Sequence, residues 1–148
     1  MQKLLYALRD NELISVDSVE RGRKCNCICP YCKQPLIAKK GNYRIHHFAH
    51  DKDSSCEHGY ETSLHLLAKE ILSESKTIVL PALKRGSRNK LVLEESMEVE
   101  ILDVRLEQYI DDVKPDVIID TERGTFYIEI YVTHKVDREK LISLRNMA

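Results

Sequence analysis

The spacing of apolar and polar positions predicts several short strands and one strongly amphipathic helix. The helix covers residues 61–75, where apolar side chains recur at the i, i+3, i+4, i+7 spacing of a buried helical face. Its apolar positions are Leu64, Leu67, Ala68, Ile71 and Leu72. Residues 3–8 and 13–19 are predicted as two strands around a polar turn, which makes an opening hairpin.

The second half of the chain is predicted to be rich in strands. Residues 77–80 are predicted to form one strand. Apolar and polar residues alternate well enough over residues 91–110 to predict one or two more. The clearest signal spans residues 113–132, where two apolar strands flank a turn at 120–124 that contains Asp, Thr and Gly. A final helix is expected after Val136.

Residues 21–58 lack a sustained apolar period but are dense in Cys, His, Gly and Lys. We therefore expect a metal, rather than an apolar core, to order this segment. The chain has five cysteines, an odd number that fits metal binding in a reducing compartment better than disulfides. We expect two domains, an N-terminal hairpin and zinc-binding module over residues 1–58 and an α/β core over residues 59–148.

A CxxC knuckle at Cys29 and Cys32 supplies the first two zinc ligands, because its tight turn points two thiolates at one cation. Zinc accepts imidazole nitrogen and thiolate sulfur in a closed tetrahedral site, and both donors follow downstream. We favour His47 with Cys56 as the remaining pair and keep His50 as the substitute for His47. The alternative is a set of buried free cysteines and ordinary surface histidines.

Cys25 and Cys27 are not needed for this site. The sequence leaves three roles open for them: a decoy pair, exchange ligands, or part of a second weak site. No general base accompanies the knuckle in a pattern typical of catalytic zinc, so we expect the zinc to be structural. Several cations surround the knuckle and could hold a phosphate backbone or form a solvated face. They are Lys24, Lys33, Lys39, Lys40 and Arg44.

Two acids are predicted to face each other in the hairpin of residues 113–132. Paired positions in an antiparallel hairpin sum to a constant, and a turn centred between 122 and 123 places Asp116 opposite Glu129. Opposed carboxylates repel each other unless a cation lies between them. This arrangement favours a Mg²⁺ or Mn²⁺ site, and the alternative is a pair of acids that face solvent.

The residues Pro115-Asp116 followed by Glu129 resemble the PD-(D/E)xK motif of the restriction-endonuclease-like fold. In such sites a divalent cation polarises the scissile phosphate and lowers the pKa of the attacking water, while a lysine stabilises developing charge. The resemblance implies an α/β (mixed) fold with a small restriction-endonuclease-like sheet flanked by helices. It also implies phosphodiester hydrolysis of DNA.

More narrowly, the chain resembles the competence protein CoiA-like family, in which a zinc-finger-like N-terminus precedes such a nuclease core. The resemblance rests on the CxxC knuckle, the segment 47–50, a helix with Glu61 and His65, and Glu129 in its strand. It spans about residues 25–145. By this resemblance, Glu61 matches the acid found on the first core helix.

The sequence departs from the motif at Tyr131, which occupies the position of the lysine. A phenol has a pKa near 10 and carries no positive charge at neutral pH. The lysines that could replace it are Lys114, Lys135 and Lys140. The departure also favours a second reading, in which a catalytically inactive nuclease-like module binds nucleic acid or protein. A third reading is a regulatory or inhibitory protein that binds its partner through the zinc module.

Amino-acid composition does little to distinguish the nuclease, the inactive binding module and the regulatory protein. Hydrophobic residues make up 43% and charged residues 32% of the 148, which is typical of a folded domain, and the net charge of −1 gives no global attraction for nucleic acid. Any DNA contact therefore needs a local basic patch, such as the loop 84–90. No apolar run approaches the length of a membrane span, so we expect a cytoplasmic protein.

Overall fold

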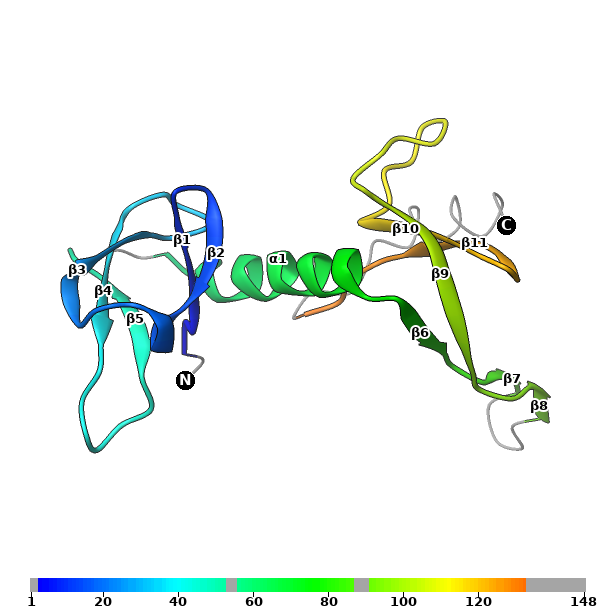
Figure 1. Cartoon of the computed structure of the whole chain (residues 1–148), viewed down its shortest axis with the longest axis horizontal. Helices are drawn as coiled ribbons and strands as arrows, with labels where there is room; N and C mark the ends of the chain where they lie inside the picture. The colour runs from blue at the N-terminus through cyan, green and yellow to red at the C-terminus, as the bar shows by residue number, and fades with distance from the viewer. Residues whose placement is uncertain (1–2, 53–55, 87–90, 133–148) are drawn as a thin grey trace. The chain divides into compact units, whose positions relative to one another are not determined.

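The computed structural model describes residues 3–52, 56–86 and 91–132 (Figure 1). The contacts within the chain divide it into two compact units, one built on Met1–Ala68 and the other on Lys69–Ile130. Helix α1 (Gly59–Glu74) contributes residues to both units, and it matches the helix predicted at 61–75 closely. The two units are described separately below.

The first unit is an antiparallel sheet of five strands in the order β2-β1-β3-β4-β5. Asp10 and Asn11 form the two-residue turn between β1 and β2, and both have positive φ angles, as the tightest hairpin turns require. A 3₁₀ turn at Val16–Ser18 follows β2, so the strand predicted at 13–19 ends at Ser15. The strands are β1 (Tyr6–Arg9), β2 (Glu12–Ser15), β3 (Gly22–Ile28), β4 (Pro35–Lys39) and β5 (His47–His50).

The first unit has an apolar core, in contrast to the expectation that a metal rather than such a core would order residues 21–58. Leu36, Ala38 and Phe48 are buried together with Cys25 and Cys27. The sequence pattern concealed this core because two of its members are cysteines, which pack as small hydrophobic residues. The cluster also includes residues from the opening hairpin, so β1 to β5 share one core.

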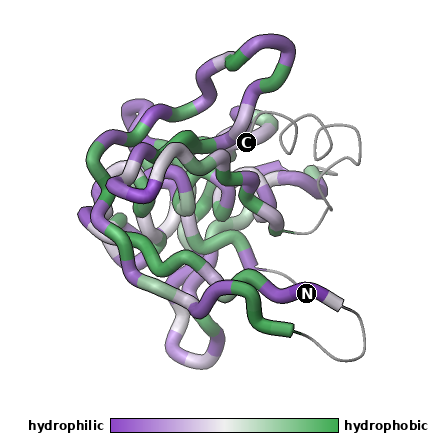
Figure 2. Tube along the Cα trace, turned by 90° about the vertical axis from the view of Figure 1, so that its right-hand side faces the viewer, coloured by the Kyte–Doolittle hydropathy of each residue, from purple (hydrophilic) through white to green (hydrophobic). Residues whose placement is uncertain are grey.

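The second unit contains an antiparallel sheet in the order β11-β10-β9-β6 and a separate two-stranded ribbon of β7 and β8. One or two strands were expected within residues 91–110, and two are present, β8 and β9. The element bounds are β6 (Thr77–Leu80), β7 (Leu83–Arg85), β8 (Leu91–Glu94), β9 (Met97–Leu106), β10 (Val117–Thr121) and β11 (Gly124–Ile128). Short hydrophobic and hydrophilic stretches alternate along the chain trace (Figure 2).

Strand β10 is the most buried strand of the second unit. It pairs with β9 on one side and β11 on the other, and Val117, Ile118 and Ile119 have no solvent exposure. Successive side chains of a strand point to opposite faces, so β10 is covered on both faces. The hairpin that carries Asp116 is therefore anchored by its first strand.

The described residues thus form a mixed fold of antiparallel sheets with one helix, and the predicted fold class is confirmed at this level. The helix expected after Val136 lies outside the described residues. No helix in the described part of the chain has the length and apolar content that a bilayer crossing requires.

Burial of β10 predicts that Ile118→Ala lowers the free energy of unfolding by about 2–5 kcal/mol, because a fully buried side chain leaves a cavity. Urea unfolding followed by circular dichroism measures the change. Leu102→Ala, on the neighbouring strand β9 and 61% exposed, is the matched control and should change stability by less than about 1 kcal/mol. Equal effects of the two substitutions would contradict the burial of β10.

Candidate functional site

The CxxC knuckle is held closed by its own backbone. The Cys29 amide donates to the Gln34 carbonyl at 2.9 Å, and the Lys33 amide donates to the Cys29 carbonyl at 3.1 Å. Lys33 adopts a positive φ of 60°, which reverses the chain directly after Cys32. This tight turn brings the two thiols of the knuckle to one side.

Four side chains from three parts of the first unit converge beside this turn. Cys29 and Cys32 come from the knuckle, His50 ends β5 and Cys56 precedes α1. Their ligand atoms all lie within 4.8 Å of one another, and among the described residues this is the only such group of three or more His, Cys, Asp or Glu side chains. The Sγ atoms of Cys29 and Cys56 are 3.8 Å apart, and Sγ of Cys32 is 3.2 Å from Nε2 of His50.

This donor set fits zinc. Tetrahedral thiolates bound at about 2.3 Å place their sulfurs about 3.8 Å apart, which agrees with the separation of Cys29 and Cys56. Three thiols and one imidazole complete a closed site without an open position for substrate. The cluster could therefore hold a zinc ion in a structural role.

Gly59, the first residue of α1, leaves room for the cluster. A Cβ atom at this position would lie 2.9 Å from Sγ of Cys29 and 3.5 Å from Sγ of Cys56. The first distance is shorter than a normal van der Waals contact, so a side chain would displace a ligand sulfur. This short segment therefore contributes in two ways. Cys56 is a ligand, and Gly59 leaves space for the sulfurs of Cys29 and Cys56.

The thiols of the knuckle titrate differently because their surroundings differ. Burial raises the pKa of Cys29 to about 11. Burial also favours the neutral thiol of Cys32, but the backbone amide of Gln34 and other hydrogen bonds outweigh it and lower the pKa of Cys32. A bound cation must displace the proton of Cys29, so metal binding releases protons and strengthens as the pH rises.

The structure places His50, the substitute considered from the sequence, in the cluster. His47, the preferred ligand from the sequence, lies outside the cluster, and its Nδ1 donates to the Ile45 carbonyl at 2.9 Å. His47 and His50 are three residues apart on β5, so their side chains leave opposite faces of the strand. His50 shares the buried face with Phe48, the face toward the cysteines.

Cys25 and Cys27 also lie outside the cluster, within the apolar core. The Cys25 thiol donates to the Leu36 carbonyl, and the Cys27 thiol donates to the Cys25 carbonyl at 3.1 Å. Burial, followed by the contact with Cys25, raises the pKa of Cys27 to about 12. Both side chains therefore pack as core residues, and the thiol of Cys27 is neutral.

The acidic hairpin of the second unit has the predicted register. Val117 pairs with Ile128 and Thr121 with Gly124, so paired positions have the same sum as Asp116 and Glu129. These two acids come directly after the last pair, at the open end of the hairpin. The Ile130 amide donates to Oδ2 of Asp116 at 2.9 Å, which fixes that carboxylate across the hairpin.

A lysine that the sequence reasoning missed lies beside these acids. Lys69, near the middle of α1, is only 8% exposed, and its Nζ lies 2.5 Å from Oε1 of Glu107 and 3.7 Å from Oδ1 of Asp116. Glu107 follows β9 with a positive φ of 51° and also accepts from Nζ of Lys114 at 3.2 Å. Hydrogen bonds from the two lysines, Lys69 first, lower the pKa of the Glu107 carboxyl.

The four side chains Asp116, Lys69, Glu107 and Lys114, which we call the charge chain, alternate in sign along a single path. Lys69 could have been found from its spacing, since it lies four residues after His65 on the same helical face. The sequence did not indicate Glu107 as a member of this group, because no local pattern links it to the hairpin.

The remaining predicted residues are placed as follows. Glu61 lies in the first turn of α1, within the first unit, whereas Asp116 and Glu129 belong to the second. Lys114 is part of the charge chain, and Tyr131 is exposed. The other candidate lysines, Lys135 and Lys140, lie outside the described residues.

Comparison with known proteins identifies the class of the first unit. Residues 12–59 match the family described as competence protein CoiA, N-terminal domain, which confirms the resemblance to the CoiA-like family for this part of the chain. The match contains all four residues of the cysteine–histidine cluster and ends at Gly59. It does not extend to the acidic hairpin. Neither the curated proteins nor the solved structures gave a match.

The cluster predicts that His50→Ala removes zinc from the purified protein and unfolds the first unit, because a ligand is lost. His47→Ala should leave about one equivalent of zinc bound, since its imidazole lies outside the cluster. Elemental analysis of the two variants, prepared without chelators, makes the comparison. Loss of zinc from His47→Ala alone would contradict the assignment.

A second prediction concerns the space at the start of α1. Gly59→Ala should weaken zinc binding by about tenfold or more, because its methyl group would meet the Cys29 sulfur, although alanine favours a helix. Competition with a chromophoric chelator measures the affinity. Gly41→Ala, where nothing lies within 4 Å of the added methyl group, is the control and should bind zinc as the wild type does. Unchanged affinity in Gly59→Ala would contradict this geometry.

Proposed function

We propose that this protein is a divalent-metal-dependent nuclease that hydrolyses phosphodiester bonds in DNA and is stabilised by structural zinc on Cys29, Cys32, His50 and Cys56. The observation that carries the proposal is the buried Lys69 beside Asp116. The motif that the sequence resembles needs two acids and a lysine, and Lys69 supplies the cation that Tyr131 cannot.

Each residue has a distinct role in the proposed reaction. When bound by Asp116 and Glu129, Mg²⁺ or Mn²⁺ would polarise the scissile phosphate and lower the pKa of the attacking water. The Ile130 amide holds the Asp116 carboxylate in one orientation. The ammonium of Lys69 contacts that carboxylate and would stabilise charge that develops on the phosphate, while the hydrogen bond to Glu107 orients the ammonium.

A second candidate function is a catalytically inactive nucleic-acid-binding module, and the same contact favours it. Opposed carboxylates need a nearby cation, and the ammonium of Lys69 already meets this need at Asp116. The two acids also do not form part of a three-residue metal-binding group among the described residues. In this reading the charge chain only stabilises the fold.

Cleavage of plasmid and linear DNA in Mg²⁺ or Mn²⁺ distinguishes the two. For a nuclease, Asp116→Asn and Lys69→Met should each reduce turnover by about a hundredfold or more, because each removes charge that acts in the transition state. DNA binding without added Mg²⁺ should change far less. Lys69→Arg, which keeps the charge, should retain more activity than Lys69→Met.

Asp103→Asn is the matched control, because this acid lies on β9 of the same unit and contacts Arg105 rather than the charge chain. Its turnover should stay close to that of the wild type. A zinc-loaded, folded wild-type protein that cleaves none of these substrates would support the inactive module. Full activity of Lys69→Met would remove Lys69 from the mechanism.

A further inference from the structure

The loop between β4 and β5, residues 40–46, projects from the sheet of the first unit and is held firmly at its base (Figure 1). Lys39 and His47 form the last pair of the two strands. Nζ of Lys40 donates to the backbone carbonyls of Asp17 and Val19 at 3.1 and 2.8 Å. A ligand that contacts this loop therefore meets a partly ordered backbone, which lowers the entropic cost of binding.

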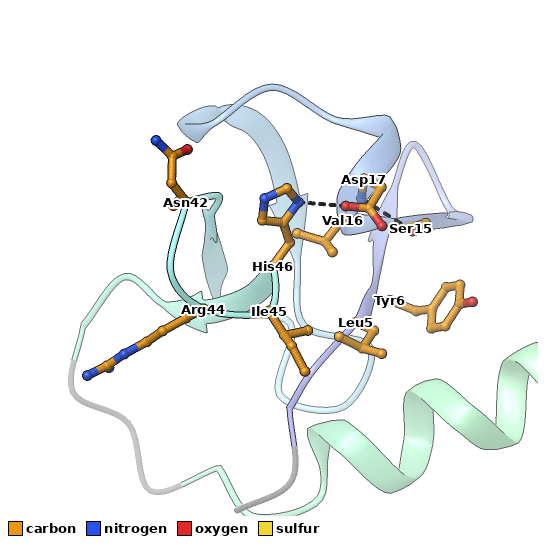
Figure 3. Close-up of a pocket in the computed structure, with 10 residues that line it drawn as sticks. Leu5, Tyr6, Ser15, Val16, Asp17, Asn42, Arg44, Ile45 and His46 are labelled. Atoms are coloured by element: carbon orange, nitrogen blue, oxygen red, sulfur yellow. Dashed lines mark hydrogen bonds and ion pairs between the residues drawn. The ribbon is translucent and has the colours of Figure 1, made fainter.

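On one side of the loop His46 contacts Asp17, while the side chain of Arg44 points away from this contact. Nδ1 of His46 lies 2.7 Å from Oδ1 of Asp17, whereas the Arg44 guanidinium extends outward from the loop (Figure 3). Asp51, directly after β5, is paired with the guanidinium of Arg23 at 2.6 Å. Asp17 and Asp51 thus each already have a basic partner.

Cations gather in a pocket along this loop. It has a volume of about 470 Å³ and is lined by the basic side chains of Arg21, Lys39, Lys40 and Arg44, with no carboxylate among its lining residues. The chain as a whole has a net charge of −1, so this concentration of positive charge is local. Such a patch complements a polyanion.

The tip of the loop also presents an unusual aromatic side chain. Tyr43 is 100% exposed, and Ile45, two residues further on, is 73% exposed. A single exposed apolar side chain is common, but here both line the basic pocket. An aromatic ring among cations is the combination with which proteins hold unpaired bases, the ring stacking on the base and the cations contacting phosphates.

We propose that this pocket and the loop tip bind single-stranded DNA, with Tyr43 stacking on a base and Arg21, Lys39 and Arg44 contacting the backbone. Lys40 positions the loop through its backbone contacts. Single strands fit better than duplexes because a fully exposed ring can stack only on an unpaired base. The choice of DNA rests on the proposed nuclease function, whereas the stacking and phosphate contacts follow from the loop itself.

The test is fluorescence anisotropy of a labelled oligothymidylate with the zinc-loaded full chain, without added Mg²⁺. Tyr43→Ala should weaken binding about tenfold, and Tyr43→Phe should stay within about twofold of the wild type, because its ring still stacks. Arg44→Gln should reduce the slope of log K against log salt concentration by about 0.7, the loss of one phosphate contact. Lys76→Gln, an exposed cation that follows α1 and lies outside the pocket, is the control and should bind as the wild type does.

Tyr43 is fully exposed, so Tyr43→Ala should retain the zinc content and circular dichroism of the wild type. Equal affinity of Tyr43→Ala and wild type would overturn the proposal. So would equal binding of a duplex, or tighter binding of an oligouridylate of the same length. Because this assay needs no cleavage, weaker binding by Tyr43→Ala supports the surface even if the protein cleaves no DNA. Cleavage that depends on Asp116 would likewise stand if the surface failed.

Discussion

The convergence of four ligands beside one knuckle is the constraint on which the first unit depends. The cluster joins the end of β3, the end of β5 and the start of α1. The short strands share an apolar core of modest size, in which Cys25 and Cys27 serve as packing residues. A zinc ion adds binding free energy of about 10–16 kcal/mol in comparable small modules, enough to fix where the helix begins.

Helix α1 contributes residues to both units. Its first residue leaves space for the cysteine sulfurs, and its buried Lys69 lies between Glu107 and Asp116 in the charge chain. A buried ammonium needs carboxylate partners, and Glu107 and Asp116 provide them. These two contacts offset the cost of burying the ammonium of Lys69. They also place a cation beside the acids of the proposed nuclease site.

Local patterns predicted the helix, the hairpin of β10 and β11 and its register, because each depends on neighbours along the chain. The choice between His47 and His50 required knowing that β5 is a strand whose inner face carries Phe48. The apolar core of residues 21–58 was missed because cysteine was taken only as a ligand. Lys69 and Glu107 meet through tertiary packing across 38 positions, which no local pattern records.

X-ray absorption at the zinc edge tests the central claim most directly, because it reports the atoms bound to the metal in the folded protein. The structure predicts three sulfur ligands at about 2.3 Å and one nitrogen ligand at about 2.0 Å in wild-type protein purified without chelators. The same shell should persist in His47→Ala, whose imidazole lies outside the cluster. A shell of four sulfurs, or one dominated by oxygen and nitrogen, would contradict the cluster of Cys29, Cys32, His50 and Cys56.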